Sequence, residues 1–334
     1  MPQPTVNDVH VNTALGQVAL GFKQTLDNLV SGKVFPEVPV VKRSNAIFEF
    51  DKAFWMRNGV GIRASGTESR GGGFSLSSDK TYYCKNHAFH IDLPKDVVEN
   101  SDLQGLETSA TEFVTWQIYM DRDLDWISRY FTDPSTGYGT TWWSKKTGVT
   151  GTPGADEFLQ WDDASSTPVK NIREYMRIIQ KRTGFKPNKL IIGPEVMDEL
   201  QLNSAVQAYV AYAPTARADI KPLVTPELLA MILGLDEVIV GEMSYTASAE
   251  GASSITYNFA FGKSALLVYA PPAPGIMVPT GGYNFVWTRM GRYNPEIAKW
   301  WIQSIKSTRI EGEAYYDHKL LGPELGIFMA DCVS

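Results

Sequence analysis

The stretch that decides the fold is RASGTESRGGGFSLSSDK, residues 63–80. Only three of its residues are apolar, while four are glycine and five are serine, so it cannot contribute to a hydrophobic core. Long loops of this kind in compact domains are usually functional or disordered. The segments on either side, 46–57 and 81–93, are rich in aromatic residues and are typical of strands. The sequence therefore predicts a long two-stranded hairpin that projects away from the body of the protein.

The charges of this projecting segment are of both signs. Arg57, Arg63 and Arg70 accompany Glu68 and Asp79. This mixture suits contact with another protein better than contact with a row of phosphates, which favours a basic surface.

The residues before the projecting segment predict an arm. In residues 13–31 apolar side chains recur every three or four positions, which predicts a helix that ends at Gly32. Pro36 and Pro39 then exclude helix from residues 33–45 and favour extended chain. A short helix followed by an extended segment indicates an arm, and an ordinary N-terminal helix packed on its own core is the alternative.

The longest predicted helix spans 102–131, about 44 Å at 1.5 Å per residue. Ser101 and Gln104 form a capping-box pattern at its start, and Pro134 follows its end. Such a helix is long enough to be the scaffold of an extended protein. Its predicted buried stripe is Leu103, Leu106, Ala110, Phe113, Gln117, Met120, Leu124, Ile127 and Phe131.

Three acidic residues near the end of this helix, Asp121, Asp123 and Asp125, mimic the start of a calcium-binding loop. The sixth position of such a loop must be glycine, but here it is Trp126. We therefore expect a solvated charged face, with Asp125 paired to Arg129 one turn later.

The second half of the chain predicts an α/β region after a loop-like stretch at 132–167. Its expected elements are a helix from Thr167 and Pro168 to Gly184, a strand at 189–192, a helix from about Glu195, a helix from Thr225 to Gly234, a strand at 238–240, a hairpin at 255–270 that turns at Gly262 and Lys263, strands at 283–289 and 298–310, and short closing strands.

The composition is that of an ordinary globular protein, with 334 residues, 43% apolar residues and a net charge of −6. Nothing in it predicts the basic face of a nucleic-acid-binding protein. The two cysteines, Cys84 and Cys332, cannot form a disulfide framework, which suggests a reducing compartment. There is no signal-peptide pattern and no apolar run of about 18 residues. We expect a soluble, intracellular protein without a membrane partner.

Catalytic motifs are missing from the sequence. It has no P-loop, nucleophile elbow, zincin motif or paired C-x-x-C. Cys84, His87 and His90, with Asp92 nearby, are the best metal candidates, but in a strand residues 84 and 87 face opposite sides. We therefore expect strand packing at these positions, and a protein with no cofactor, no metal and no enzyme activity.

The order of these segments resembles the major capsid protein of tailed double-stranded-DNA bacteriophages, the Hong Kong 97-type fold. The resemblance covers nearly the whole chain. The segments that carry it are LVSGKVFPEVPVVKRSNAIFEFDK, RASGTESRGGGFSLSSDKTYYCKNHAFHIDLP, the helix from Asp102 to Phe131, GFKPNKLIIGPEVMDELQLN, NFAFGKSALLVYAPPAP and YYDHKLLGPELGIFMADCV.

The resemblance implies an α+β fold of five parts. These are an N-terminal arm (1–44), an extended β-hairpin loop (45–93), a peripheral domain (94–160) with a spine helix at 102–131, an axial α/β domain (161–285) and strands that return to the peripheral domain (286–334).

It also implies a structural function. Copies would form hexamers and pentamers of an icosahedral head, assembled in the host cytoplasm, that encloses DNA without sequence-specific binding. The loop 57–85 would lie over a neighbouring subunit, and residues 1–40 would reach beneath or around another. The implied partners are other copies, a separate scaffolding protein, a portal protein and a decoration protein. The expected contacts between subunits are Phe35, Pro36, Arg57, Arg63, Glu68, Arg70 and Phe74.

Two other readings remain open. An encapsulin, a nanocompartment shell protein of the same fold, has a helical N-terminus that docks cargo, and the predicted helix at 13–31 is compatible with one. An intracellular α/β enzyme or ligand-binding protein is the alternative from another class. The polar stretch at 63–80 argues against this alternative, because it would contribute nothing to the fold of such a protein.

Overall fold

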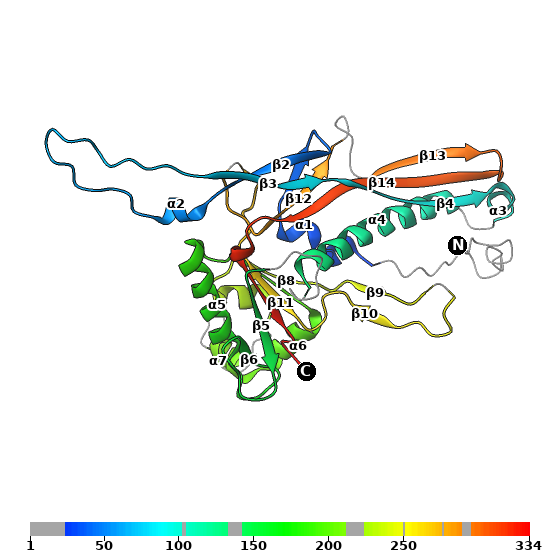
Figure 1. The fold of residues 1–334 in the computed structure, drawn as a ribbon. Coiled ribbons are helices and arrows are strands. Elements are labelled where there is room, and N and C mark those ends of the chain that lie inside the picture. Colours follow the sequence, from blue (N-terminus) through cyan, green and yellow to red (C-terminus); the bar gives the residue numbers. More distant parts are fainter. Residues whose placement is uncertain are drawn as a thin grey trace.

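The structure is a computed structural model and describes residues 24–101, 105–132, 142–211, 224–249, 251–275, 277–288 and 295–334. It is a mixed α/β fold built on two larger sheets, one of five strands and one of six. A long helix lies along the first sheet, and a two-stranded projection extends far from the body (Figure 1).

The five-stranded sheet is organised around one long strand. Its members are β1 (Glu37–Val40), β4 (Lys85–Pro94), β12 (Gly282–Trp287), β13 (Glu296–Ile302) and β14 (Ser307–Leu320). β14 pairs antiparallel with β4 along one edge and with β13 and β12 along the other, and β1 adds parallel to β12. The single strand predicted at 298–310 is wrong, because a tight turn with Lys306 at φ 45° divides it into β13 and β14.

Helix α4 (Leu106–Tyr130) is the predicted long helix, but it is shorter at its start. It begins after Gly105, whose φ of 83° is left-handed, so Asp102 is not its first residue. Residues 102–104 of the predicted capping box lie outside the described residues. Neither α4 nor any other helix in the described ranges has the length and hydropathy of a membrane span.

The buried face of α4 differs from the predicted stripe. Val114 and Ile118 pack under β14 and β4, and they are 0% and 3% exposed. Phe113, expected inside, is 45% exposed and makes a T-shaped contact with the ring of Phe89. The error arises because the helix carries apolar residues on more than one face, and the sheet, which the sequence does not locate, selects the face that is covered.

The six-stranded sheet belongs to the α/β part of the chain. In spatial order its strands are β6 (Glu157–Leu159), β5 (Ser144–Val149), β15 (Gly326–Ala330), β11 (Ala265–Val268), β7 (Lys189–Ile192) and β8 (Glu237–Val240). Its helices are α5 (Pro168–Thr183), α6 (Pro194–Leu202), α7 (Ser204–Ala211) and α8 (Pro226–Leu233). The predictions for α5, β7, α6, α8 and β8 are confirmed within one or two residues.

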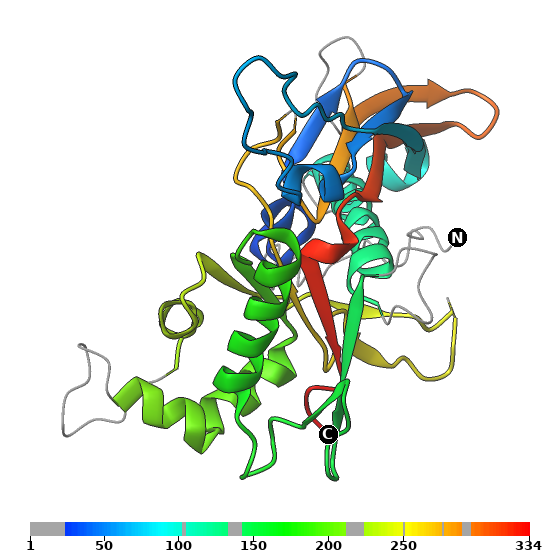
Figure 2. The same ribbon diagram turned by 60° about the vertical axis from the view of Figure 1, so that its left-hand side comes forward.

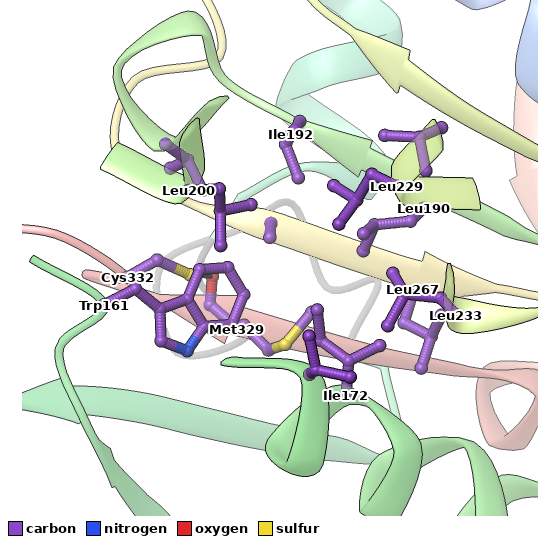
Figure 3. Packing of buried hydrophobic residues seen from close by; sticks show 14 of the residues in the cluster. Trp161, Ile172, Leu190, Ile192, Leu200, Leu229, Leu233, Leu267, Met329 and Cys332 are labelled. Carbon is purple, nitrogen blue, oxygen red and sulfur yellow. Dashed lines mark hydrogen bonds between the residues drawn. The ribbon is translucent and has the colours of Figure 1, made fainter. Parts of the chain in front are cut away.

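Helices cover one face of this sheet (Figure 3). Ile192, Leu267 and Met329, from three neighbouring strands, point to that face and pack with Ile172 of α5 and Leu229 of α8. All five are nearly inaccessible to solvent. This cluster is the larger core of the protein.

The opposite face of the same sheet packs on the end of α4. Ile191, Leu266 and Phe328 belong to a second cluster with Trp126 and Tyr130 of that helix. Burial on both faces explains why the central strands read as continuous apolar runs instead of alternating ones.

Two predictions for this region are wrong. Residues 132–167 are not all loop, since β5 and β6 lie there. β5 has the polar sequence SKKTGV, yet it lies between β6 and β15 in the sheet. Its Lys146 is buried and pairs with Asp156 at 2.6 Å. The hairpin predicted at 255–270 does not form either. β10 (Tyr257–Phe259) pairs with β9 (Ser244–Thr246), whereas β11 lies between β7 and β15.

The six-stranded sheet takes its strands from more than one of the predicted ranges. Strands β5 and β6 fall within the range 94–160, and β15 falls within the range 286–334, yet all three belong to the six-stranded sheet. The chain therefore enters this sheet before the predicted axial range and ends inside it. β14, in contrast, packs along α4.

The N-terminal segment packs on its own chain in the described residues. Val30, Val34 and Phe35 are 0%, 0% and 1% exposed and join the cluster beneath the six-stranded sheet. The helix predicted over 13–31 does not continue here. A 3₁₀ turn, η3 (Leu26–Asn28), is followed by the short helix α1 (Ser31–Val34), and residues 13–23 lie outside the described residues.

Asp123 is the reason that α1 forms at this place. Its carboxylate accepts hydrogen bonds from the backbone N–H groups of Val30 and Ser31, at 3.0 and 2.6 Å. The expectation that Asp123 is solvated is therefore wrong, since it is 0% exposed. The expected pair of Asp125 with Arg129 is confirmed at 3.0 Å.

Candidate assembly surfaces

The projecting segment leaves the body between strands β2 (Ser44–Phe50) and β3 (Leu76–Tyr83), which pair antiparallel. Residues 57–75 contain no helix or strand, and every one of them is exposed. Figure 1 shows this loop extending well beyond the rest of the chain. The predicted hairpin is confirmed, although residues 52–56 form the short helix α2 (Lys52–Met56) and not a strand.

The predicted strand at 81–93 is divided at Cys84. β3 ends before this residue and pairs with β2, whereas β4 begins after it and pairs with β14. Cys84 itself is fully buried and packs beside Tyr82, Tyr283 and Phe285. The base of the projection is thereby fixed to the five-stranded sheet.

Three aromatic rings form an exposed cluster at the root of the projection. Phe74 lies 5.8 Å from Phe50 and 6.3 Å from Trp55, measured between ring centroids. Trp55 and Phe74 remain 60% and 63% exposed. Fully burying one such apolar side chain contributes about 1.5–3 kcal/mol, so this cluster would be stabilised by a partner that covers it.

The charged residues predicted for this surface are exposed along the loop. Arg57 lies over the ring of Phe54 at 5.7 Å, and the Arg63 side chain donates to the backbone oxygen of Thr67. Glu68 and Arg70 are exposed farther along the loop. Thus Arg57, Arg63, Glu68, Arg70 and Phe74 all lie exposed on the projecting segment, and only Phe74 belongs to the aromatic cluster.

The other two predicted contact residues are elsewhere. Phe35 packs inside its own chain, with Tyr130 and Trp142 as ring neighbours, so it is not available to another subunit. Pro36 is half-buried, and its carbonyl accepts a backbone hydrogen bond from Asn284. The sequence alone does not show which apolar side chains return to the core, and for this reason it does not distinguish Phe35 from a contact residue of the arm.

An ionic cluster holds the root of the projection against the α/β part. Lys52 of α2 forms an ion pair with Glu324, and Arg182 of α5 reaches the same carboxylate at 2.8 Å. The Arg182 guanidinium also lies 3.7 Å over the ring of Trp143. Burial, and then the nearby Arg182 charge, lower the pKa of Lys52. These contacts set the direction in which the loop leaves the body.

The edge strand β13 offers a second surface that the sequence predictions missed. Trp300 and Trp301 are 42% and 45% exposed, and Ile297 and Ile305 are exposed beside them. β13 pairs on one side only among the described residues. Adjacent residues on a strand point to opposite faces, so an exposed tryptophan lies on each face of the hairpin formed by β13 and β14.

The metal candidates are held apart. Cys84 is buried, and burial raises the pKa of its thiol to about 11. His87 Nδ1 lies 2.7 Å from Asp121, while Asp92 forms a two-pronged pair with Arg309 at 2.7 Å. No group of three His, Cys, Asp or Glu side chains suited to a metal occurs in the part of the chain that the structure describes.

No protein-family model matches the sequence, and no curated protein matches it. Solved structures do resemble the fold. A crystal structure of a phage-related protein from Bordetella bronchiseptica has a TM-score of 0.65 at 20% identity, covering 92% of this chain and 94% of that chain. The capsid structure of the cyanophage P-SCSP1u has a TM-score of 0.61 at 9% identity, covering 98% and 95%.

An encapsulin complex from Synechococcus elongatus is also similar, with a TM-score of 0.51 at 9% identity and coverage of 100% and 98%. The first two likenesses are stronger than this one and extend over nearly the full length of both chains. The protein has the fold of phage major capsid proteins.

Proposed function

We propose that the chain is a structural shell protein whose copies form the hexamers and pentamers of an icosahedral phage head enclosing double-stranded DNA. The observation that carries the proposal is the exposed loop 57–75 with its uncovered aromatic cluster, on a fold of phage capsid type. A loop that makes no core of its own stabilises the protein only by burying surface on another molecule.

In this proposal the partner of the projecting loop is a neighbouring copy of the same chain. Phe74 and Trp55 supply the apolar contact, and Arg57, Arg63, Glu68 and Arg70 supply charges of both signs around it. Residues upstream of Val30 would reach another neighbour, since residues 30–36 are held by their own subunit. A scaffolding protein, a portal protein and a decoration protein would complete the head, in the host cytoplasm and then in the virion.

A shell protein needs no catalytic site, and the likeness to capsid proteins favours a structural role. The second candidate is an encapsulin-type nanocompartment, which the similarity to the Synechococcus complex supports. The contents distinguish the two, because packaged nucleic acid is expected in a phage head and a protein cargo in a nanocompartment.

A photo-crosslinking residue at Ser69, in the projecting loop, tests which molecule the loop contacts. Light and heavy isotope-labelled chains are mixed during assembly, irradiated and digested. We expect hybrid light–heavy peptides that join the loop to one defined surface. Dissociated subunits carrying the same label serve as the control. Crosslinks confined to single chains in assembled particles would refute the proposed contact.

A further inference from the structure

A chain of buried hydrogen bonds connects His318 to the N-terminal segment. Asn284, which is 0% exposed, donates from its side-chain nitrogen to the carbonyl oxygens of Ser31 at 2.7 Å and Phe35 at 3.2 Å. The oxygen of the same amide lies 2.8 Å from Nδ1 of His318, which is also 0% exposed. Residues 31–35 are thus tied to β12 and β14 through two side chains.

This geometry fixes the position of the ring proton. Both amide hydrogens of Asn284 are directed to carbonyl oxygens, so its own oxygen can only accept a hydrogen bond. Nδ1 of His318 must therefore carry a proton, and Nε2 holds the lone pair in the neutral ring. Nε2 lies 3.3 Å from the carbonyl oxygen of Arg122 and 3.9 Å from the carboxylate of Asp125.

Charges from several elements face this ring. Two oxygens near Nε2 would favour a second proton, but the Asp125 carboxylate already pairs with Arg129 at 3.0 Å. Burial first, and then the positive charges of Arg122 and Arg129, hold the pKa of His318 well below its ordinary value. The titratable and charged groups around it are Asp121, Arg122, Asp125, Arg129 and Tyr130 of α4, His87 of β4, and Tyr316 and Asp317 of β14. Glu37 of β1 pairs with Arg122, and Asp317 pairs with Arg129, so each guanidinium group has a carboxylate partner.

We propose that His318 is a proton-sensitive clamp on the N-terminal segment. In its neutral form it positions Asn284 to hold residues 31–35 against the body. A second proton would place a positive charge on a ring that is 0% exposed, and the cost of burying that charge is removed when the segment separates and water enters. The clamped state therefore binds fewer protons than the open state, so acidification favours opening.

The size of the pH effect on opening follows from the uptake of one proton by His318. Below about pH 6.5, the ordinary pKa of histidine, the opening equilibrium should increase by up to about tenfold per pH unit, until the clamped form itself titrates. Asp123 acts in the opposite sense, because burial raises the pKa of its carboxyl group in the clamped state. A variant at position 318 separates the two contributions.

The use of the clamp rests on the proposed function, because the residues before Val30, once residues 31–35 are released, could reach a neighbouring subunit only in an assembly. The clamp itself is a property of one chain. It can therefore be tested by hydrogen exchange whether or not shells form, so failure of the clamp and failure of the shell proposal are distinguishable.

The experiment is hydrogen–deuterium exchange between about pH 7.5 and about pH 5, corrected for the intrinsic pH dependence of exchange. The reporting amides are those of Val30, Ser31, Lys33 and Val34, each of which donates a hydrogen bond in the clamped state. We expect their protection to fall by up to about tenfold per unit below about pH 6.5, while protection of β11 stays constant.

His318→Gln is the decisive variant, because a glutamine amide can still donate to Asn284 but does not titrate. It should remove the pH dependence of protection in residues 30–34, whereas His90→Gln, a half-buried histidine on β4, should retain it. Wild-type protection that is constant with pH, or a His318→Gln protein that keeps the wild-type pH dependence, would overturn the proposal.

Nitrogen-15 spectra of labelled histidine provide a second test that needs no variant. The proposal requires a neutral His318 ring with the proton on Nδ1 at about pH 7. A doubly protonated ring at that pH would overturn the proposal even if the glutamine variant does not fold.

Discussion

The ring of Phe35 packs against the ring of Tyr130, with 4.8 Å between their centroids, and joins the N-terminal segment to the last turn of α4. Both side chains are almost fully buried. The contact makes residues 30–36 a part of the subunit's core, so that any segment which reaches other subunits must lie before Val30.

Phe35→Ala should destabilise the subunit by about 3–5 kcal/mol, because it leaves a cavity between two aromatic neighbours. Phe48→Ala is the matched control, since Phe48 is 67% exposed, and it should change the free energy of unfolding by less than about 0.5 kcal/mol. Chemical denaturation of both variants measures the difference. Equal stability of the two variants would show that Phe35 does not occupy the core.

Val114→Asp and Phe113→Asp form a neighbouring pair on α4 that tests which face of the helix is covered. Val114 is 0% exposed, so a carboxylate there should cost about 3–5 kcal/mol or prevent folding. Phe113 is 45% exposed and makes a T-shaped contact with Phe89, so Phe113→Asp should cost about 1 kcal/mol. Thermal unfolding followed by circular dichroism compares the two variants. A larger loss of stability in Phe113→Asp than in Val114→Asp would mean that the sheet covers the Phe113 face of α4.

Replacing residues 59–72 by a short Gly-Ser turn should leave the subunit folded and its assembly impaired. These residues are exposed and lie outside the helices and strands, and Phe50 and Phe74 remain at the root. Circular dichroism checks folding, while particle counts by electron microscopy check assembly. Normal numbers of particles from the shortened chain would mean that the loop is not an assembly contact.

The double substitution Trp300→Ser with Trp301→Ser should reduce assembly more than stability. Both side chains are close to half exposed on an edge strand, where unpaired apolar strands tend to associate. The unfolding free energy should fall by less than about 1 kcal/mol. Sedimentation velocity reports the assembled fraction of the protein. If that fraction is unchanged in the double variant, β13 is not an assembly surface.

The elements that the sequence predicted best carry their own start and stop signals. Helix α8 begins where the Thr225 side chain accepts a hydrogen bond from the N–H of Leu228, and it ends at Gly234 with φ 69°. Helix α5 likewise ends at Gly184 with φ 81°. Such signals are local, so one sequence is enough to predict them. The projecting loop was equally predictable, because its polarity excludes it from any core.

The errors concern relationships between distant segments. Nothing near Asp123 in the sequence shows that it would cap a helix more than ninety residues earlier, and nothing near Phe113 shows which face of α4 the sheet covers. β5 is polar by composition, yet it pairs with β15 at the other end of the chain. The β13 surface was missed because exposure follows from the position of a strand at the edge of a sheet.

The most direct test of the shell proposal is electron microscopy, with light scattering, of the expressed protein in lysate and after purification. We predict hollow closed particles with masses in the megadalton range, or rings of five and six subunits. A small oligomer of one fixed size in both samples, with neither rings nor shells, would contradict the account.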